Sequence, residues 1–168
     1  ELLKLFRPPH AARGLDLLRD SGLLAHVLPE LVDTICCEQS PEFHPEGDVY
    51  NHIRLMLDSV DDDAPVELPW TILLHDIAKP ATAAIGKDGL IYNYGHDKLG
   101  AKMAEDILRR LKFPRKQIDA IVFTVLKHMN LAAAPKMRKA KLRRMLLRPT
   151  FELELEQHRI DCLGSHRK

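Results

Sequence analysis

The sequence has 168 residues with a formal net charge of +1 at pH 7, and 45% of its residues are hydrophobic but only 5% are aromatic. This length is sufficient for one domain with a substantial core. The shortage of aromatic residues favours an all-α fold over a β-sandwich. A near-neutral chain excludes any argument for nucleic-acid binding from overall charge.

The three cysteines indicate neither a disulfide framework nor a zinc-ribbon site, because Cys36 and Cys37 are neighbours and Cys162 makes the count odd. We therefore expect a reducing cytoplasm as the compartment. The sequence has no stretch of 18 or more uncharged apolar residues and no signal peptide, so no membrane partner is expected. The first residue is Glu rather than Met and lies within an expected helix, which predicts a longer parent chain.

The N-terminal part of the chain is predicted to form short antiparallel helices. Residues 1–6 have the pattern of a helix end, and two prolines follow them. Residues 10–19 and 23–32 carry leucines at helical spacing, and Pro29 predicts a break in the second of these segments.

A loop is predicted next, over residues 38–48, because it contains prolines and a glycine. Its His44 is either a substrate contact or an ordinary loop histidine. Asp48 is predicted to cap a helix over residues 49–60. This helix carries His52 in its first turn and a buried apolar stripe after it.

The most apolar helix is predicted over residues 68–78. Pro69 suits its first turn, and Pro80 prevents it from continuing much further. It ends with His75 and Asp76, so an adjacent imidazole and carboxylate lie at the end of a buried segment. Burying an unpaired carboxylate costs several kcal/mol, so such a pair usually binds a metal or joins a polar network.

A small β-hairpin is predicted over residues 83–94, because residues 86–89 form a turn signal. Further helices are predicted over residues 96–111, 115–129, 137–147 and 151–163, with a linker at residues 132–135. His96 opens the first of these helices, His128 lies near the end of the second, and Asp161 lies in the last.

Residues 136–148 carry seven cations without an intervening acid. Six of them are candidate RNA contacts, namely Lys136, Arg138, Lys139, Lys141, Arg143 and Arg144. One interpretation is the solvated face of an amphipathic helix that buries Leu142, Met145 and Leu146. The other is a patch that contacts RNA phosphates. The sequence leaves both interpretations open.

Six side chains at or near the ends of predicted helices are candidate ligands of one metal site. They are His52, His75, Asp76, His96, His128 and Asp161. Imidazoles and carboxylates bind divalent metals, so the site would hold one or two ions of Mn, Fe, Co, Ni, Zn or Mg, whose identity the sequence does not give. The alternative is a buried polar network without metal.

One ion would be held by four of these side chains, namely His52, His75, Asp76 and Asp161. His96 and His128 would add a second ion. Two metals lower the pKa of a shared water, which attacks phosphorus, and they neutralise charge on the phosphoryl group. Lys79, one turn beyond His75, joins His75 and Asp76 as a catalytic candidate, because it can hold a substrate phosphate or stabilise developing charge.

The pattern of His52, then His75-Asp76, then Asp161 resembles the HD superfamily of metal-dependent phosphohydrolases. His96 and His128 resemble the additional ligands of its binuclear members. Longer phrases resemble the C-terminal part of bacterial poly(A) polymerase and CCA-adding tRNA nucleotidyltransferase family proteins. They are Gly14-Leu-Asp-Leu-Leu, Ser21-Gly-Leu-Leu, Leu28-Pro-Glu-Leu, His44-Pro-Glu-Gly-Asp, Leu74-His-Asp-Ile-Ala-Lys-Pro and Gly95-His-Asp-Lys-Leu-Gly-Ala.

This resemblance implies a short helical neck at residues 1–38, which helps to bind tRNA, and an HD-domain helical bundle at residues 39–168. It implies a phosphodiesterase or phosphatase that acts on nucleotide or RNA-end phosphates, as some relatives do on 2′,3′-cyclic phosphates. The family's polymerase head, with its Gly-Ser turn and paired aspartates, has no counterpart in these residues, so we do not expect them to add nucleotides.

Two alternatives remain open. The neck and HD fold would form a non-catalytic body that binds RNA, with a structural or vestigial metal. An HD-type di-iron oxygenase would use the same six ligands, although the neck-like N-terminus argues against it. The sequence gives no indication of oligomeric state.

Overall fold

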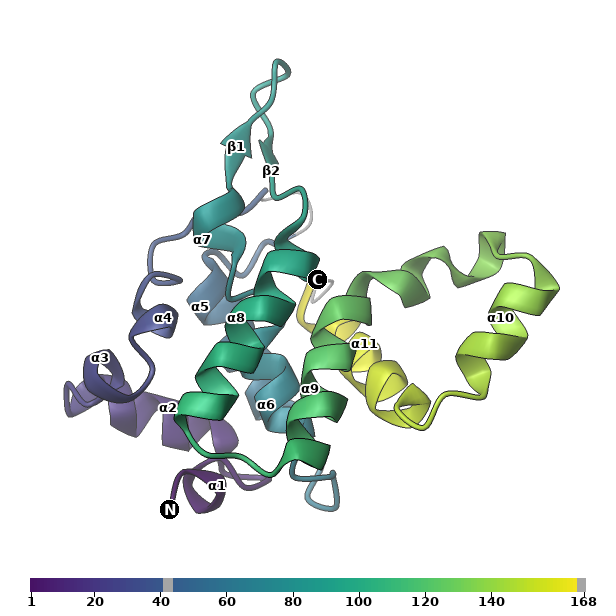
Figure 1. The fold of residues 1–168 in the computed structure, drawn as a ribbon. Coiled ribbons are helices and arrows are strands. Elements are labelled where there is room, and N and C mark those ends of the chain that lie inside the picture. Colours follow the sequence, from purple (N-terminus) through teal and green to yellow (C-terminus); the bar gives the residue numbers. More distant parts are fainter. Residues whose placement is uncertain (41–43, 166–168) are drawn as a thin grey trace.

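The computed structural model describes residues 1–40 and 44–165, and the fold is all-α with one small β-hairpin, as predicted (Figure 1). The elements are α1 (Leu2–Leu5), α2 (Ala11–Asp20), α3 (Leu24–Val27), α4 (Pro29–Val32), α5 (Val49–Asp58), α6 (Leu68–Leu74), α7 (Lys79–Thr82), β1 (Ala84–Ile85), β2 (Ile91–Tyr92), α8 (His96–Arg110), α9 (Arg115–Lys127), the 3-10 helix η1 (His128–Lys136), α10 (Lys139–Leu146) and α11 (Phe151–Ser165). None of the helices in the described residues has the length and apolar content that a membrane span requires.

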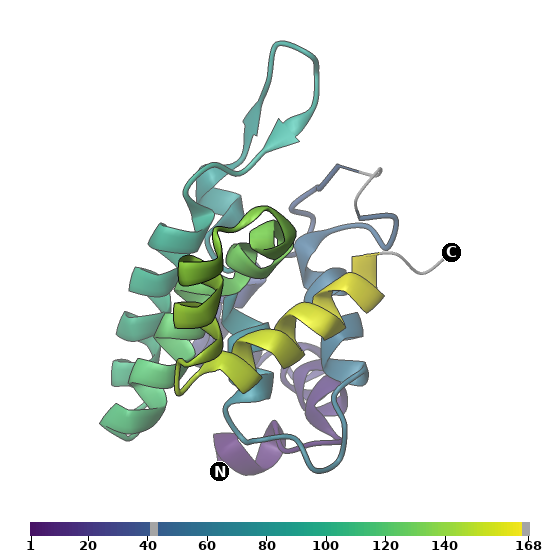
Figure 2. The same cartoon turned by 90° about the vertical axis from the view of Figure 1, so that its right-hand side faces the viewer.

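Helix α6 is the centre of the fold, and all its residues are buried. Helices α5, α8, α9 and α11 each pack against it, and Figure 2 shows α11 crossing the face formed by α5 and α6. The Trp70 ring packs edge-on against Phe6 and Phe113, with ring centroids 5.1 and 4.7 Å away. Full burial of a large apolar side chain contributes about 1.5–3 kcal/mol. Trp70 therefore anchors both the N-terminal segment and the loop after α8 to the core.

Helix α6 is shorter than the predicted range 68–78, because residues 75–78 form a turn. In this turn the backbone N–H of Lys79 donates to the Asp76 carbonyl at 2.9 Å, a bond that spans three residues rather than four. Pro80 has no N–H with which to extend α6, and it lies instead in the first turn of α7. The turn leaves the imidazole and the carboxylate at the end of a buried helix.

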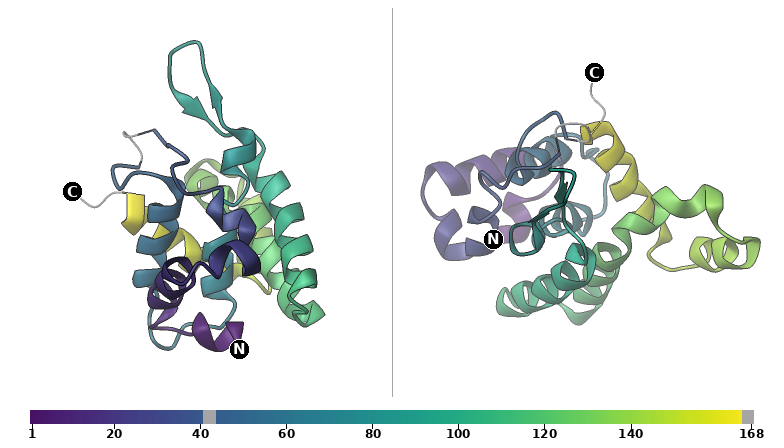
Figure 3. Two further views of the ribbon diagram at one scale, coloured as in Figure 1. Left: turned by 90° about the vertical axis from the view of Figure 1, so that its left-hand side faces the viewer. Right: turned by 90° about the horizontal axis from the view of Figure 1, so that it is seen from above.

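Helices α1 to α4 lie together on one side of the molecule, and α2 packs on α5 (Figure 3). The Asp16 carboxylate on α2 accepts two hydrogen bonds of 2.8 Å from the Arg54 guanidinium on α5. Paired charge-assisted bonds of this kind fix both distance and orientation. Gly14 is needed on α2, because a Cβ there would collide with the Leu5 carbonyl of α1. The N-terminal helices are thus held on the helix that carries His52.

The β-hairpin is shorter than the predicted range 83–94, and its strands pair antiparallel through two residue pairs. Gly89 in the turn has a φ of +79°, a conformation that favours glycine. The hairpin projects from the helical body in Figure 1. Its Ile91 lines the cavities described below.

The region after α9 differs from the prediction. Residues 128–136 form η1, so the predicted linker at residues 132–135 is wrong, and α9 ends before His128. Helix α10 stands apart from the helical body (Figures 1 and 3). Met145 is buried as expected, but Leu146 is 49% exposed, so its predicted burial is wrong. Consecutive helical residues point about 100° apart, and a helix that buries Met145 therefore turns Leu146 outward.

Candidate metal centre

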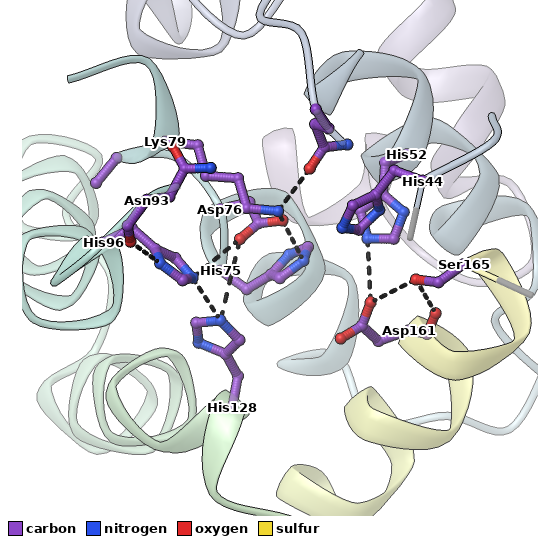
Figure 4. Close-up of polar contacts among 12 residues, drawn as sticks. His44, His52, His75, Asp76, Lys79, Asn93, His96, His128, Asp161 and Ser165 are labelled. Atoms are coloured by element: carbon purple, nitrogen blue, oxygen red, sulfur yellow. Dashed lines mark hydrogen bonds and ion pairs between the residues drawn. The ribbon is translucent and has the colours of Figure 1, made fainter. Parts of the chain in front are cut away.

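The structure brings the six predicted ligands together from five separate segments. Figure 4 shows their side chains pointing toward one another. They come from α5 (His52), the turn after α6 (His75 and Asp76), the start of α8 (His96), the start of η1 (His128) and α11 (Asp161). Helices that pack around α6 therefore bring distant parts of the chain to the end of that helix.

Local structure explains how two of these side chains are placed. The Asp48 carboxylate accepts the backbone N–H of Asn51 at 2.8 Å, which confirms the predicted cap of α5 and fixes His52 in its first turn. Gly95 has a φ of +80°, and this left-handed residue lets the chain turn sharply from the hairpin into α8 at His96.

Asp76 lies at the centre of the cluster, and its side chain is 3% exposed. Its Oδ2 atom is 3.1 Å from the Nε2 of His75 and 2.7 Å from the Nζ of Lys79. Its Oδ1 atom is 3.4 Å from the Nε2 of His96 and 4.0 Å from the Nε2 of His128. The two carboxylate oxygens thus face different histidines, Oδ2 toward His75 and Oδ1 toward His96 and His128.

A second group of ligand atoms lies beside the first. The Nε2 of His52 is 3.1 Å from the Oδ1 of Asp161, and the ring centroids of His52 and His75 are 5.5 Å apart. Within the described residues, His52, His75 and Asp161 have ligand atoms within 4.8 Å of one another, and so do Asp76, His96 and His128. Because His75 and Asp76 are in contact, the two groups form one continuous cluster.

Three of the histidines are oriented by their own backbone. In each, Nδ1 contacts the carbonyl of the residue three positions earlier, and because a carbonyl only accepts, Nδ1 must donate. The pairs are His75 with Ile72 at 2.8 Å, His96 with Asn93 at 2.6 Å and His128 with Val125 at 2.6 Å. Because Nδ1 donates outward in each ring, Nε2 is the nitrogen that faces the cluster, which is the orientation that metal-binding histidines require.

The donor atoms fit a cation. The Nε2 atoms of His52 and His75 are buried and make no hydrogen bond of acceptable geometry. The Nε2 atoms of His96 and His128 are 3.1 Å apart, so two lone pairs face each other unless a proton or a cation lies between them. Buried polar groups are normally satisfied, and a set of imidazoles and carboxylates suits divalent transition metals.

The carboxylates of the cluster are ionised. Burial raises the pKa of Asp76, but His75 and Lys79 outweigh that effect and hold the pKa well below its usual range. Burial likewise raises the pKa of Asp161, and His52 and His75 outweigh it, so the pKa is lowered. The cluster therefore contains the buried Asp76 carboxylate and the Asp161 carboxylate, whose side chain is 26% exposed, and a metal cation would neutralise their negative charge.

Two histidines have pKa values shifted in opposite directions. Burial lowers the pKa of His52, but the adjacent Asp161 and Glu46 carboxylates outweigh burial and raise it to about 9. Burial and the neighbouring His75 lower the pKa of His128 to about 4, with Asp76 opposing them. At neutral pH the metal-free cluster thus holds a proton on His52, which a metal must displace.

Lys79 lies inside the site, as the sequence predicts, and is 8% exposed. Its Nζ is 2.7 Å from Asp76 and donates a hydrogen bond of 2.5 Å to the Oε1 of Gln39. A cavity of about 400 Å³ is lined by Lys79 and by every candidate ligand except the fully buried His52, and its wall includes Ser40 and His44. The loop histidine is therefore at the cavity that gives access to the cluster.

The sequence did not identify Glu46, whose Oε1 is 2.6 Å from the Nδ1 of His52. It also did not identify Gln39, which contacts Lys79, or Asp16, the buried partner of Arg54. These residues lie in a loop or depend on a contact between segments far apart in the chain, so no helical period marks them. The only local signal is the phrase His44-Pro-Glu-Gly-Asp, in which Glu46 lies six residues before His52.

The predicted RNA contacts lie apart from the metal cluster, on a segment that we call the basic arm (residues 136–148). Its six candidate cations are all exposed, namely Lys136, Arg138, Lys139, Lys141, Arg143 and Arg144. The arm connects η1, which starts at His128, to α11, which carries Asp161. It thus leaves and re-enters the fold beside two elements that carry candidate ligands.

Comparison with known families gives two matches. The family model described as HD domain matches residues 47–158. A model described as a probable RNA and SrmB-binding site of polymerase A matches residues 1–34.

Individual relatives agree with these matches. A multifunctional CCA protein of Halorhodospira halophila is 35% identical over 139 residues, which are 82% of this chain and 33% of the relative. A multifunctional CCA protein of Azoarcus sp. is 34% identical over 164 residues, which are 92% of this chain and 39% of the relative. An A-adding tRNA nucleotidyltransferase of Deinococcus radiodurans is 38% identical over 133 residues, which are 77% of this chain and 30% of the relative. The chain spans about a third of the length of the curated relatives it matches.

Proposed function

Because the chain belongs to the HD-domain family, in the form found in CCA-adding and poly(A) polymerase proteins, we propose that it is a metal-dependent phosphohydrolase for nucleotide or RNA-end phosphates. The observation that carries this proposal is the arrangement around Asp76. Its two oxygens face different histidines at the base of an open cavity that also contains a lysine.

We assign residues 1–38 to a neck and residues 39–168 to the HD domain. His52, His75 and Asp161 would hold one ion, His96 and His128 a second, and Asp76 would bridge them. When bound, divalent ions held by these residues would lower the pKa of a water and neutralise phosphoryl charge. We propose a cytoplasmic location, which agrees with the free state of all three cysteines.

Lys79 is the residue that would hold the substrate phosphate. Its ammonium group is buried beside Asp76, at the cavity wall, and it is oriented by Gln39. A buried cation in a water-poor site acts on developing phosphoryl charge more strongly than an exposed one. The same position requires that Lys79 share the Asp76 carboxylate with any bound metal.

Hydrolysis of a 2′,3′-cyclic nucleotide and of bis-p-nitrophenyl phosphate by metal-reconstituted protein tests this proposal. We expect turnover of at least one ester by the wild type, and loss of turnover in His75→Ala and Asp76→Asn. His26→Ala is the matched control, because it removes an exposed histidine of α3. A wild type that binds metal but hydrolyses neither ester with any divalent ion would contradict the proposal.

A second function is favoured by the basic arm, whose six candidate cations are exposed and have no acidic residue among them. In this alternative the neck and the HD domain form a body that binds tRNA, and the metal has a structural role. Tight and salt-dependent tRNA binding without turnover in any metal would support it. Oxygen consumption by iron-loaded protein would instead support the di-iron oxygenase, which the matched RNA-binding segment at residues 1–34 disfavours.

A further inference from the structure

We infer that Glu46, which is not one of the six candidate ligands, is a positioning residue that fixes His52 for metal binding. The inference rests on the metal centre of the proposed function but not on its hydrolytic activity. Glu46 would hold the ligand ring in place and make it a better electron donor without touching the metal.

The contact geometry supports this role. The Oε1 atom of Glu46 lies 2.6 Å from the Nδ1 of His52, and the opposite ring nitrogen, Nε2, faces Asp161 at 3.1 Å. A carboxylate accepts, so the ring donates from Nδ1 and directs Nε2 to the cluster. The side chains of Glu46 and His52 are 5% and 0% exposed, so little solvent competes with this bond. A buried carboxylate on the outer nitrogen of a metal-bound histidine fixes its orientation and raises its basicity.

His52 differs in this respect from the other three candidate ligand histidines. Their Nδ1 atoms donate to backbone carbonyls of the preceding turn, which any side chain at that position would supply. His52 alone is oriented by a side chain, and this side chain brings a full negative charge. The His52 half of the centre therefore depends on one replaceable residue, whereas the His96 and His128 half does not.

The same oxygen also holds His44. The Nδ1 of His44 is 2.9 Å from the Oε1 of Glu46, and the His44 ring meets the His52 ring edge-on with centroids 4.9 Å apart. His44 lines the metal cavity and an adjoining cavity of about 500 Å³. Glu46 thus ties the cavity wall to the ligand. Loss of the Glu46 carboxylate therefore removes a contact from both His44 and His52, whereas loss of His44 leaves the contact between Glu46 and His52 in place.

Co²⁺ binding distinguishes these roles and does not require turnover. Purified metal-free protein is titrated with Co²⁺ against a competing chelator, and the visible absorption of the ion follows each binding step. For Glu46→Gln, which keeps the shape of the side chain, we expect one binding step to weaken by about 10–100-fold. The other step should stay within about twofold, because its histidines use backbone carbonyls.

Two matched variants complete the test. His44→Ala should leave both Co²⁺ steps within about twofold. Glu154→Gln changes another buried glutamate, which pairs with Arg148 at 2.9 Å, and should affect thermal stability but not Co²⁺ affinity. Circular dichroism of each variant checks that it is folded.

Several outcomes would overturn the inference. Unchanged Co²⁺ affinity in a folded Glu46→Gln protein would leave Glu46 a purely structural role. Equal weakening of both steps, or the same loss in Glu154→Gln, would show a general effect of destabilisation. A third bound Co²⁺ that disappears in His44→Ala would make Glu46 a direct ligand instead. Wild-type protein that binds Co²⁺ but hydrolyses no ester contradicts only the proposed function.

Discussion

Metal-free protein is predicted to lose stability as the pH rises above neutrality, because its cluster holds a proton on His52. The pKa of this ring is raised from 6.5 to about 9 by the Asp161 and Glu46 carboxylates, against the opposing effect of burial. A group whose pKa is raised by folding contributes stability that is fully present below its unfolded pKa. That contribution is lost as the pH rises through the folded pKa, here between about 6.5 and 9.

The magnitude follows from the two pKa values. A rise from 6.5 to about 9 corresponds to roughly 3 kcal/mol of folding free energy. His52 is fully buried, so solvent screening reduces this figure little. Small domains are stable by only about 5–15 kcal/mol, so the loss is a large fraction of the total.

Urea denaturation at pH 6.0 and pH 9.5, with a chelator present, measures this effect. The control is His52→Gln, which has no titrating group at this position but retains polar atoms. We expect the wild type to lose roughly 3 kcal/mol more than the variant between the two pH values. Saturating metal should abolish the difference, because the ion takes the place of the proton. Equal losses in the wild type and the variant would refute the reasoning.

Three other perturbations give direct tests. Asp76→Asn should remove both bound ions, measured by equilibrium dialysis, and unchanged metal content would contradict the bridging role. The same variant should destabilise metal-free protein by about 3–5 kcal/mol, because the buried ammonium group of Lys79 loses its partner. The double variant Lys139→Ala/Arg143→Ala should lower tRNA affinity and reduce the slope of log binding constant against log salt concentration by about one per cation. Turnover of a cyclic mononucleotide should stay unchanged. An unaltered slope would exclude the basic arm from the tRNA contact. Gly14→Ala should lower the free energy of unfolding by about 1–3 kcal/mol, because its Cβ meets the α1 backbone; wild-type urea stability would show that α1 moves freely.

The sequence was sufficient for the all-α fold and for the grouping of the six polar side chains. Each side chain lies at or near a helix end beside an apolar stripe, and such stripes must pack against a common core. His75 and Asp76 are the clearest case, since a fully buried and mostly apolar helix leads directly to them. Helices that pack around α6 then bring the remaining candidates to its end.

The sequence was not sufficient for features that depend on a single loop residue or on contacts between distant segments. Glu46 has no periodic signal, and its role follows only from the position of His52 in the folded chain. The bond from Arg54 to Asp16 joins residues 38 positions apart. Residues 132–135, which were predicted to be a linker, lie within the 3-10 helix η1 (His128–Lys136), since short 3-10 segments commonly serve as connectors.

The metal content of the protein tests the central claim most directly. Elemental analysis of freshly purified protein, and of protein reconstituted with a divalent metal, gives the metal-to-chain ratio. Six convergent ligands with a bridging Asp76 predict a ratio near two, falling to near zero in Asp76→Asn. A ratio near zero in the reconstituted wild type would contradict the account and would leave the cluster as a buried polar network.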